Sequence, residues 1–201
     1  TDELIPSGET SSYRSNPLGL AEFTLSRKDP AYVGLAKEMR AAEEVRRSGA
    51  DVTESNAEVA RAFKVIKEAY PELNVAETEI GSTIFAVKPG DGSAREQAAS
   101  CQRVLGGLAN IANEYATKRY RSNLINWGLI PFIIDEGELP FKNGDFIFIP
   151  DAVKAIRDKA SEVKAYVVKD KLCEFTLKIG ELTDDERQII LDGCLINYYR
   201  H

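Results

Sequence analysis

The chain has 201 residues, and its 26 basic and 32 acidic side chains give a net charge of −6. This acidic balance argues against nucleic acid as a partner, because contacts to phosphates need a basic surface. His201 is the only histidine, so a zinc site built from this chain's own ligands is disfavoured, and Ser-His-Asp or Cys-His catalysis within this polypeptide is excluded.

The first third of the chain predicts a loop followed by helices. Residues 1–29 are rich in turn formers and predict a long irregular loop. Apolar residues recur at helical spacing over 30–47, which predicts a helix that Gly49 ends. A second helix, capped by Thr53 or Asn56, is expected to stop before Pro71. Both are charged on one face, so we expect a helical insertion near residues 30–72 that forms a surface layer.

From residue 83 onward, short β-type runs alternate with helical segments. Strands are predicted at 83–87, 108–111, 129–134 and 146–149, and helices at 94–104 and 113–127. Residues 163–168 and 173–179 predict a hairpin around 169–171, and the segment 183–186 caps a last helix. This order of elements predicts one mixed α/β domain.

The three cysteines and the hydropathy pattern indicate the compartment. Cys101, Cys173 and Cys194 are sparse and widely spaced, which is typical of thiols packed as small apolar residues in a reducing environment. The longest apolar stretch, 124–134, is shorter than the roughly 20 residues of a membrane span, and the acidic opening does not resemble a signal peptide. We therefore expect a cytoplasmic protein, or one of the mitochondrial matrix in a eukaryote.

The sharpest local motif is residues 90–96, GDGSARE, where a strand is predicted to meet a helix. Glycines allow a backbone to approach a ligand closely, and free N–H groups at a helix start favour an anion. Arg95 would add a fork for a carboxylate. The pattern alone fits better a capping box between Ser93 and Glu96, so the cap is favoured and the anion site is the alternative.

Three other charged groups have a simple structural interpretation beside a functional one. Arg14, in the loop 11–16, would bind an anion, although a solvated loop arginine is the commoner case. Residues 119–123, RYRSN, form either a basic patch or, more simply, a charged helix face against its own domain. The acidic run 184–186 fits the electrostatics of a helix N-terminus better than a metal site.

Four segments, in chain order, resemble blocks of the aconitase family. Residues 89–99, PGDGSAREQAA, resemble its G-x-G-S-S-R-E-H-A segment, and residues 121–131, RSNLINWGLIP, its R-S-N-L-x-x-x-G-x-x-P block. The opening TDELIPSG resembles the T-D-H-I-x-x-A-G stretch, and residues 191–200, LDGCLINYYR, the closing G-G-I-L-N-Y block. Four blocks in the right order are far more specific than one, although residues 30–72 match none of them.

The resemblance implies the C-terminal swivelling domain of an aconitase-like hydratase, with a β/β/α fold and a barrel-like strand layer. It implies one domain over residues 1–201, cut from a longer chain or supplied as a small subunit, and the start inside a family block favours the cut. In the family a [4Fe-4S] cluster is bound by other domains, so we expect no metal ligands in this chain. The expected partners are those cluster-bearing domains and a small polycarboxylate, with no nucleic acid and no membrane, and the chain alone should be inactive.

The resemblance also implies roles for individual residues. Ser93 falls where the family has its catalytic base, and Asp2 on an active-site aspartate that supports a histidine from another domain. Arg14 and Arg95 fall on arginines that bind substrate carboxylates. Ala94 falls on the family's second serine, where only the backbone N–H remains to contact a carboxylate.

Departures from the family pattern bear on the substrate. Ala94 replaces a serine, and Gln97 and Glu3 each replace a histidine. These changes favour hydration of a related hydroxy acid over citrate–isocitrate isomerisation. A non-catalytic binding or regulatory module on the same fold is the alternative function, and an anion-binding protein that uses the 92–95 helix start is another.

Overall fold

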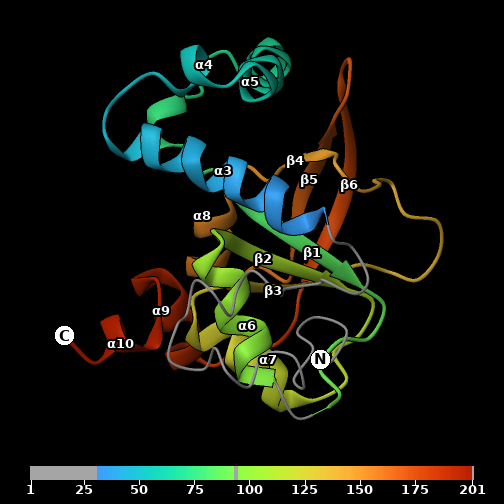
Figure 1. The fold of residues 1–201 in the computed structure, drawn as a ribbon. Coiled ribbons are helices and arrows are strands. Elements are labelled where there is room, and N and C mark those ends of the chain that lie inside the picture. Colours follow the sequence, from blue (N-terminus) through green and yellow to red (C-terminus); the bar gives the residue numbers. More distant parts are fainter. Residues whose placement is uncertain (1–30, 93–94, 201) are drawn as a thin grey trace.

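The computed structural model describes residues 31–92 and 95–200, so the loop predicted over 1–29 lies outside the described residues. Within the described residues the strands form a six-stranded sheet of order β1-β2-β3-β6-β5-β4. Figure 1 shows β1–β3 running across the molecule and β5 and β6 nearly upright, so the sheet is strongly curled. The predicted α/β fold with a barrel-like strand layer is confirmed. The strands are β1 Ser82–Ala86, β2 Gly107–Ala112, β3 Ile130–Ile133, β4 Phe146–Phe148, β5 Glu162–Val168 and β6 Leu172–Ile179.

The parallel half of the molecule consists of β1, β2 and β3 with helices α6 (Arg95–Val104) and α7 (Lys118–Asn126). Each parallel connection needs a crossover, and α6 and α7 supply the two crossovers. The two helices pack against each other and against β2 and β3. Their apolar faces are completely buried in a shared core that includes Ala98, Leu105 and Leu124.

The antiparallel half consists of β4, β5 and β6. The predicted hairpin is confirmed, because β5 and β6 pair in register from Glu162↔Lys178 to Val168↔Leu172. This half joins the parallel half through a short antiparallel seam, in which β3 and β6 pair only Phe132↔Ile179 and Ile133↔Lys178. One hydrophobic core extends beneath both sides of this seam, because Ala165 and Leu177 of the hairpin are buried in the same cluster as Ile111 and Phe132 of the parallel half.

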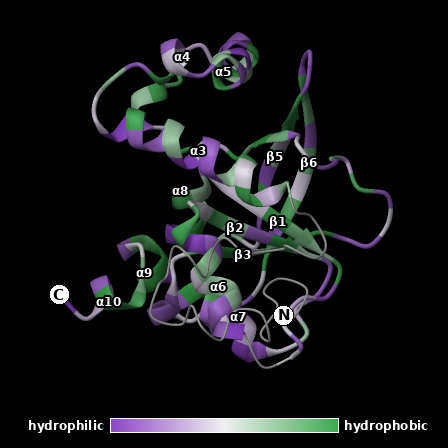
Figure 2. Ribbon diagram, viewed as in Figure 1, coloured by the Kyte–Doolittle hydropathy of each residue, from purple (hydrophilic) through white to green (hydrophobic). Residues whose placement is uncertain are grey.

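The helical layer consists of α3 (Tyr32–Arg47), α4 (Val52–Ser55) and α5 (Ala57–Ala69), followed by a 3₁₀ turn at Val75–Glu77. The predicted Asn56 cap is confirmed, since its side chain accepts hydrogen bonds at the start of α5. Figure 2 shows hydrophobic and hydrophilic residues alternating along α3 and α5. The apolar faces of α4 and α5 pack on the antiparallel half, where Val59, Phe63 and Ile66 are buried, while α3 runs along the β1 edge (Figure 1).

The structure departs from the predicted elements at the start of α7 and in the additional helix α8. The helix predicted over 113–127 is α7 and begins only at Lys118, because the preceding residues bond across to the loop after β1. The short helix α8 (Ala152–Arg157) is absent from the sequence prediction, and its N-terminal neighbour Asp151 is left-handed at φ 59°. The remaining helices are α9 (Asp184–Asp192) and α10 (Leu195–Tyr198). No helix in the described part of the chain combines the length and hydrophobicity that crossing a membrane requires.

Candidate functional site

Three loops leave the parallel strands at one edge of the sheet. Residues 87–92 follow β1, residues 113–117 follow β2, and residues 134–145 follow β3. Because the three strands are parallel, their carboxyl ends lie together, as Figure 1 shows. This edge is where open α/β sheets usually bind ligands, and the predicted anion-binding segment 90–96 begins there.

The loops after β1 and β2 are joined by backbone hydrogen bonds. The Glu114 N–H donates to the Val87 carbonyl at 3.1 Å, and the Ala116 N–H donates to the Pro89 carbonyl at 2.8 Å. These bonds extend the pairing of β1 and β2 beyond the strands themselves. The first loop is therefore held against the second rather than projecting freely into solvent.

Gly90 is the central residue of the first loop. Its φ is +111°, and a Cβ built on it would lie 2.6 Å from the Tyr120 Cβ, so both its backbone conformation and its surroundings require glycine. Its carbonyl accepts hydrogen bonds from Arg95 Nε at 3.1 Å and from Thr117 Oγ1 at 3.0 Å. One carbonyl oxygen thus connects the first loop to the starts of both α6 and α7.

A closed ring of buried polar side chains lies behind this loop. The Gln102 amide donates to the Tyr120 hydroxyl at 3.0 Å, the hydroxyl donates to Asn110 Oδ1 at 2.9 Å, and the Asn110 amide donates back to Gln102. All three residues are at most 1% exposed. Burial raises the pKa of the Tyr120 phenol well above its ordinary value, so the phenol keeps its proton as a donor. The ring fixes α6 and α7 against β2.

Arg95 is the one predicted site residue that the structure describes. It is the first residue of α6, half-buried, with its Nε held by the Gly90 carbonyl. Asp2, Arg14, Ser93 and Ala94 lie outside the described residues. The expected convergence of Arg14, Ser93 and Arg95 and the Ser93 cap therefore stay predictions.

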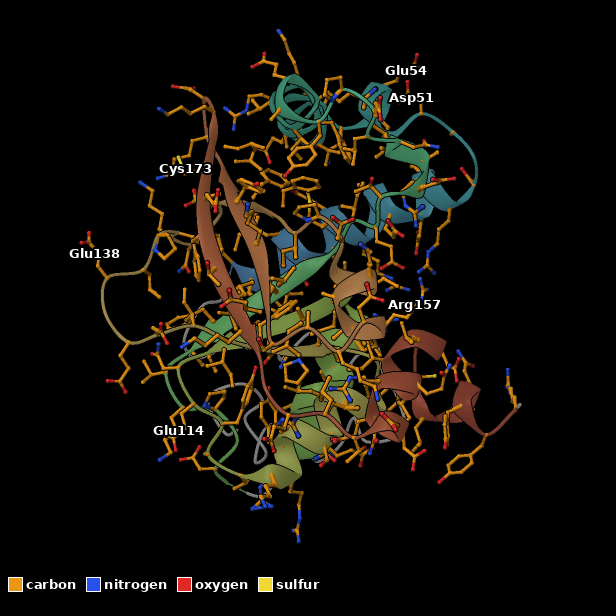
Figure 3. All side chains as sticks on the ribbon, turned by 180° about the vertical axis from the view of Figure 1, so that it is seen from behind. Asp51, Glu54, Glu114, Glu138, Arg157 and Cys173 are labelled. Carbon is orange, nitrogen blue, oxygen red and sulfur yellow. The ribbon has the colours of Figure 1, made fainter. Side chains whose placement is uncertain are left out.

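Charged side chains surround the loops at this edge. Lys88 forms an exposed ion pair with Glu114 at 3.4 Å, and Lys178 Nζ contacts Asp135 Oδ1 at 2.7 Å. The Asp135 hydrogen bond raises the pKa of the exposed Lys178 ammonium. Figure 3 shows Glu114 and Glu138 on the same side of the molecule, both pointing outward from their loops. The rim of this edge therefore carries both signs of charge.

The predicted basic patch at 119–123 and the acidic run at 184–186 contact each other. Arg121 Nη1 lies 3.4 Å from Glu186 Oε2, and Arg121 Nη2 donates to the Glu181 carbonyl. Thr183 and Glu186 form a capping box at the start of α9. The structural interpretation of both segments is therefore confirmed: Arg121 binds its own domain, and the carboxylates begin a helix.

The three cysteines lie on different elements and form no disulfide. Cys101 is buried in α6, while Cys173 in β6 and Cys194 before α10 are half-buried. Across residues 31–92 and 95–200, no three histidine, cysteine, aspartate or glutamate side chains are grouped to hold a metal ion. The described part of the chain therefore does not fit an iron–sulfur cluster, whose iron needs several thiolates from one neighbourhood.

Two surface hollows lie away from the strand-end loops. One, of about 330 Å³, lies between α5 and the tip of the β5–β6 hairpin and is lined by Arg61, Lys64 and Lys169 among others. The other, of about 430 Å³, lies beside α8 and includes Tyr70 and Asp151. Neither touches a residue of the loop 87–92 or Arg95, so neither is part of the candidate site.

Sequence reasoning missed Thr117 and the polar ring. Thr117 could have been identified from the sequence, because a threonine that precedes a helical segment is a typical N-cap. In the structure its side chain accepts the Tyr120 N–H at 3.1 Å. The ring gave no comparable signal. Gln102 and Asn110 look like surface residues in the sequence, and only the packing of α6 on β2 buries them.

Comparisons with known proteins agree with this geometry. Residues 51–137 match the model of the aconitase C-terminal domain family, a segment that includes the glycine loop, α6, α7 and all three parallel strands. No curated protein sequence matches the chain. The fold is similar to the crystal structure of 3-isopropylmalate dehydratase (leuD) from Methanocaldococcus jannaschii, with a TM-score of 0.58 and 24% identity over 99% of this chain and 84% of that chain.

The family match begins in the helical layer, ahead of α4, and ends just beyond β3. It therefore covers the segment from which Arg95, Gly90 and Thr117 come. The structural similarity extends over nearly the whole chain. The predicted resemblance to the C-terminal domain of the aconitase family is therefore confirmed over residues 51–137, the part that carries the glycine loop, and the similarity to the dehydratase structure extends the likeness in fold to nearly the whole chain.

Proposed function

We propose that this chain is the swivelling domain of an aconitase-like hydro-lyase, which dehydrates a hydroxy-polycarboxylate and rehydrates the product. The observation that carries the proposal is the position of Arg95. This arginine begins α6 beside the glycine loop, at the carboxyl edge of the parallel strands, inside the segment that matches the family model. A guanidinium at the start of a helix is well suited to bind a carboxylate.

The proposed chemistry assigns a role to each residue that the resemblance implied. Ser93, as an alkoxide, takes a proton from the carbon beside a substrate carboxylate, and the electron pair of that C–H bond forms a carbon–carbon double bond. The C–O bond on the neighbouring carbon breaks with its electron pair, and the leaving hydroxide becomes water by taking up a proton that an acidic group of the other domains donates. Arg14 and Arg95 hold two carboxylates so that only one proton is in line with Ser93. Asp2 supports a histidine from another domain.

A serine is a weak base, so its alkoxide needs positive surroundings. Arg95 and the first N–H groups of α6 supply such surroundings next to Ser93 in the sequence. Ala94 contributes its backbone N–H to a substrate carboxylate. The positive potential needed at this point is local, and it is compatible with a chain whose net charge is −6.

The cluster of the proposed enzyme belongs to a different domain or subunit, because the described residues of this chain do not fit it. A [4Fe-4S] cluster held there would supply a Lewis acid for the hydroxyl that leaves. The chain is then one domain of a longer polypeptide or a small subunit, and its partner is the cluster-bearing part. We expect the chain on its own to be inactive.

The similarity to 3-isopropylmalate dehydratase makes 3-isopropylmalate the first substrate to try, with citrate as the comparison. Both are hydroxy acids that present at least two carboxylates to a pair of arginines. Replacement of the family's second serine by Ala94 removes one polar contact, which favours the less polar substrate. We therefore expect turnover of 3-isopropylmalate rather than citrate.

The Arg95→Lys variant tests the proposal in the complete enzyme. A lysine keeps the charge but loses the planar fork, so KM for 3-isopropylmalate should rise roughly 10- to 100-fold. Arg103→Lys is the matched control, because Arg103 lies at the other end of the same helix and its hydrogen bond among the described residues goes to the Gly107 carbonyl, at 3.1 Å. Its KM should be unchanged, and initial rates over a range of substrate concentrations give both values.

Equal effects of the two substitutions would contradict the proposal. So would an enzyme in which Arg95→Lys leaves KM unchanged. Binding of 3-isopropylmalate without any turnover in the complete, cluster-loaded protein would favour the alternative of a non-catalytic binding or regulatory module.

A further inference from the structure

We infer that Thr117 is a positioning residue of the proposed site: its hydroxyl orients the Gly90 carbonyl, which in turn holds the Arg95 guanidinium in one orientation. The inference rests on the proposed function, because it needs Arg95 to bind a substrate carboxylate. Thr117 acts on the substrate through Gly90 and Arg95, and we do not expect it to contact the substrate itself.

The Thr117 hydroxyl makes two hydrogen bonds of opposite kind. It accepts the Tyr120 N–H at 3.1 Å and donates to the Gly90 carbonyl at 3.0 Å. A hydroxyl has one proton to donate and can accept at the same time, so both bonds form together. Thr117 therefore caps α7 and fixes the glycine loop with a single group.

The Gly90 carbonyl needs this support. Gly90 and Gly92 both have positive φ, at +111° and +86°. Glycine moves between backbone conformations at a lower cost than other residues, so these angles are not fixed by the residues themselves. The Ala116–Pro89 bond holds the residue before Gly90, but the Gly90 carbonyl itself is fixed only by side chains in the described structure, those of Thr117 and Arg95. Without Thr117, the acceptor that holds Arg95 is free to rotate.

The bond to Gly90 also decides which side of the Arg95 fork is available. A guanidinium binds a carboxylate either through Nε and one Nη or through the two Nη groups. Because Nε donates to Gly90 at 3.1 Å, only the end with both Nη groups remains. The described residues offer those two groups no hydrogen-bond partner, and we expect them to receive the substrate carboxylate. Thr117 thus selects the end-on geometry of the fork.

Thr117→Val tests the inference in the complete enzyme, because valine keeps the shape of the side chain and loses both hydrogen bonds. We expect KM for 3-isopropylmalate to rise about tenfold while kcat changes by less than about twofold, the signature of weakened uniform binding. Thr117→Ser keeps the hydroxyl and should restore KM. Thr183→Val removes the corresponding cap of α9; the Thr183 side chain accepts the Glu186 N–H rather than a group of the glycine loop, so KM should stay unchanged despite a similar loss of thermal stability.

A second measurement reads the geometry without turnover. Exchange of the Arg95 Nε proton with water, followed by NMR on the full chain and assigned with Arg95→Lys, reports the bond to Gly90. It should be slow in the native protein and in Thr117→Ser, and faster in Thr117→Val. In an Arg95→Lys background, Thr117→Val should raise KM no further, because the group that it orients is already gone.

Each contrary result is distinct. Unchanged exchange and unchanged KM in Thr117→Val overturn the inference alone, provided that Arg95→Lys still raises KM. A fall in kcat with unchanged KM would mean that Thr117 acts through a different residue of the loop than Arg95, and this result also overturns the inference. If Arg95→Lys itself leaves KM unchanged, the proposed function fails first.

Discussion

The parallel half and the antiparallel half of this molecule are stabilised in different ways. In the parallel half, a ring of three fully buried polar side chains joins two helices to the central strand β2. Where the helical layer packs on the antiparallel half, the corresponding polar contact is the bond between the hydroxyls of Tyr70, at the end of α5, and Tyr166 in β5 at 2.8 Å, which is only partly buried. The first arrangement fixes one geometry, whereas water can replace the second.

This difference follows from the connections between strands. The antiparallel strands β5 and β6 are joined by a tight turn at residues 169–171, which leaves no room for a long functional loop. Parallel strands each need a crossover helix, so every strand ends in a loop on the same edge. The half of the molecule that offers a site is therefore also the half that needs a precise internal polar network. The predictions below test this contrast.

The largest effect is expected for Gly90→Ala in the parallel half. The new methyl group would lie 2.6 Å from the Tyr120 Cβ and would also impose a strained φ. The two costs together should lower the free energy of unfolding by about 4 kcal/mol. Gly49→Ala in the helical layer is the control, because Gly49 has φ +86° but open space around it, and it should lose only about 1 kcal/mol. Urea unfolding measures both, and equal losses would contradict the contrast.

An intermediate effect is expected for Glu43→Gln, which tests whether the helical layer depends on charge. The Glu43 carboxylate is 9% exposed and binds Arg46, Arg47 and the Ile80 N–H, so it joins α3 to the segment before β1. Removing its charge leaves Arg46 without a carboxylate partner, although its bond to the Ala76 carbonyl remains, and should cost about 3 kcal/mol. Glu44→Gln is the control, since its pair with Arg40 is exposed and should contribute no more than about 0.5 kcal/mol.

The stabilisation that Glu43 provides should also depend on pH. Burial alone would raise the pKa of the Glu43 carboxyl, but hydrogen bonds from Arg46, Ile80 and Arg47 outweigh burial and hold the pKa below its ordinary value. The resulting stabilisation is complete above the ordinary glutamate range and is lost as the pH falls through the lower pKa of the folded state. The stability advantage of the native protein over Glu43→Gln should therefore shrink in acid. An advantage that stays constant down to the acid transition would exclude this ionisation as its source.

The smallest effect separates the two polar contacts directly. Tyr120→Phe leaves Asn110 and Gln102 unsatisfied in the core and should cost about 2 kcal/mol. Tyr70→Phe removes a hydroxyl whose partner, Tyr166, still reaches water, and should cost less than about 1 kcal/mol. Thermal or urea unfolding of both variants gives the comparison. A larger loss of stability in Tyr70→Phe than in Tyr120→Phe would contradict the conclusion that the parallel half depends more strongly on its polar contacts.

The sequence predicted the elements whose signals are local. The β5–β6 hairpin alternates with period two, and Thr183 and Glu186 form a capping box within four residues. The start of α7 was predicted too early, because the bonds that keep residues 113–117 out of the helix run to another loop. Helix α8 was missed, since it is short and follows a left-handed Asp151 that no composition rule indicates.

The candidate site was predictable to a similar extent. Arg95 and the glycines carry a motif that can be recognised one residue after another. The link from Thr117 to Gly90 spans 27 positions, and the ring depends on how α6 faces β2. Such contacts are properties of the packed core, and no local pattern encodes them.

The short seam between β3 and β6 has a consequence for the order of folding. The β5–β6 hairpin closes over three residues, whereas each parallel pairing must close over a whole helix, and the entropy cost of closure grows with that length. The seam itself contributes only two residue pairs to the stabilisation gained when the two halves pair. We therefore expect the hairpin to form early in refolding and the parallel strands to pair late, at a rate limited by these non-local contacts. The loops around Gly90 and Thr117 would then be among the last parts of the chain to reach their native positions.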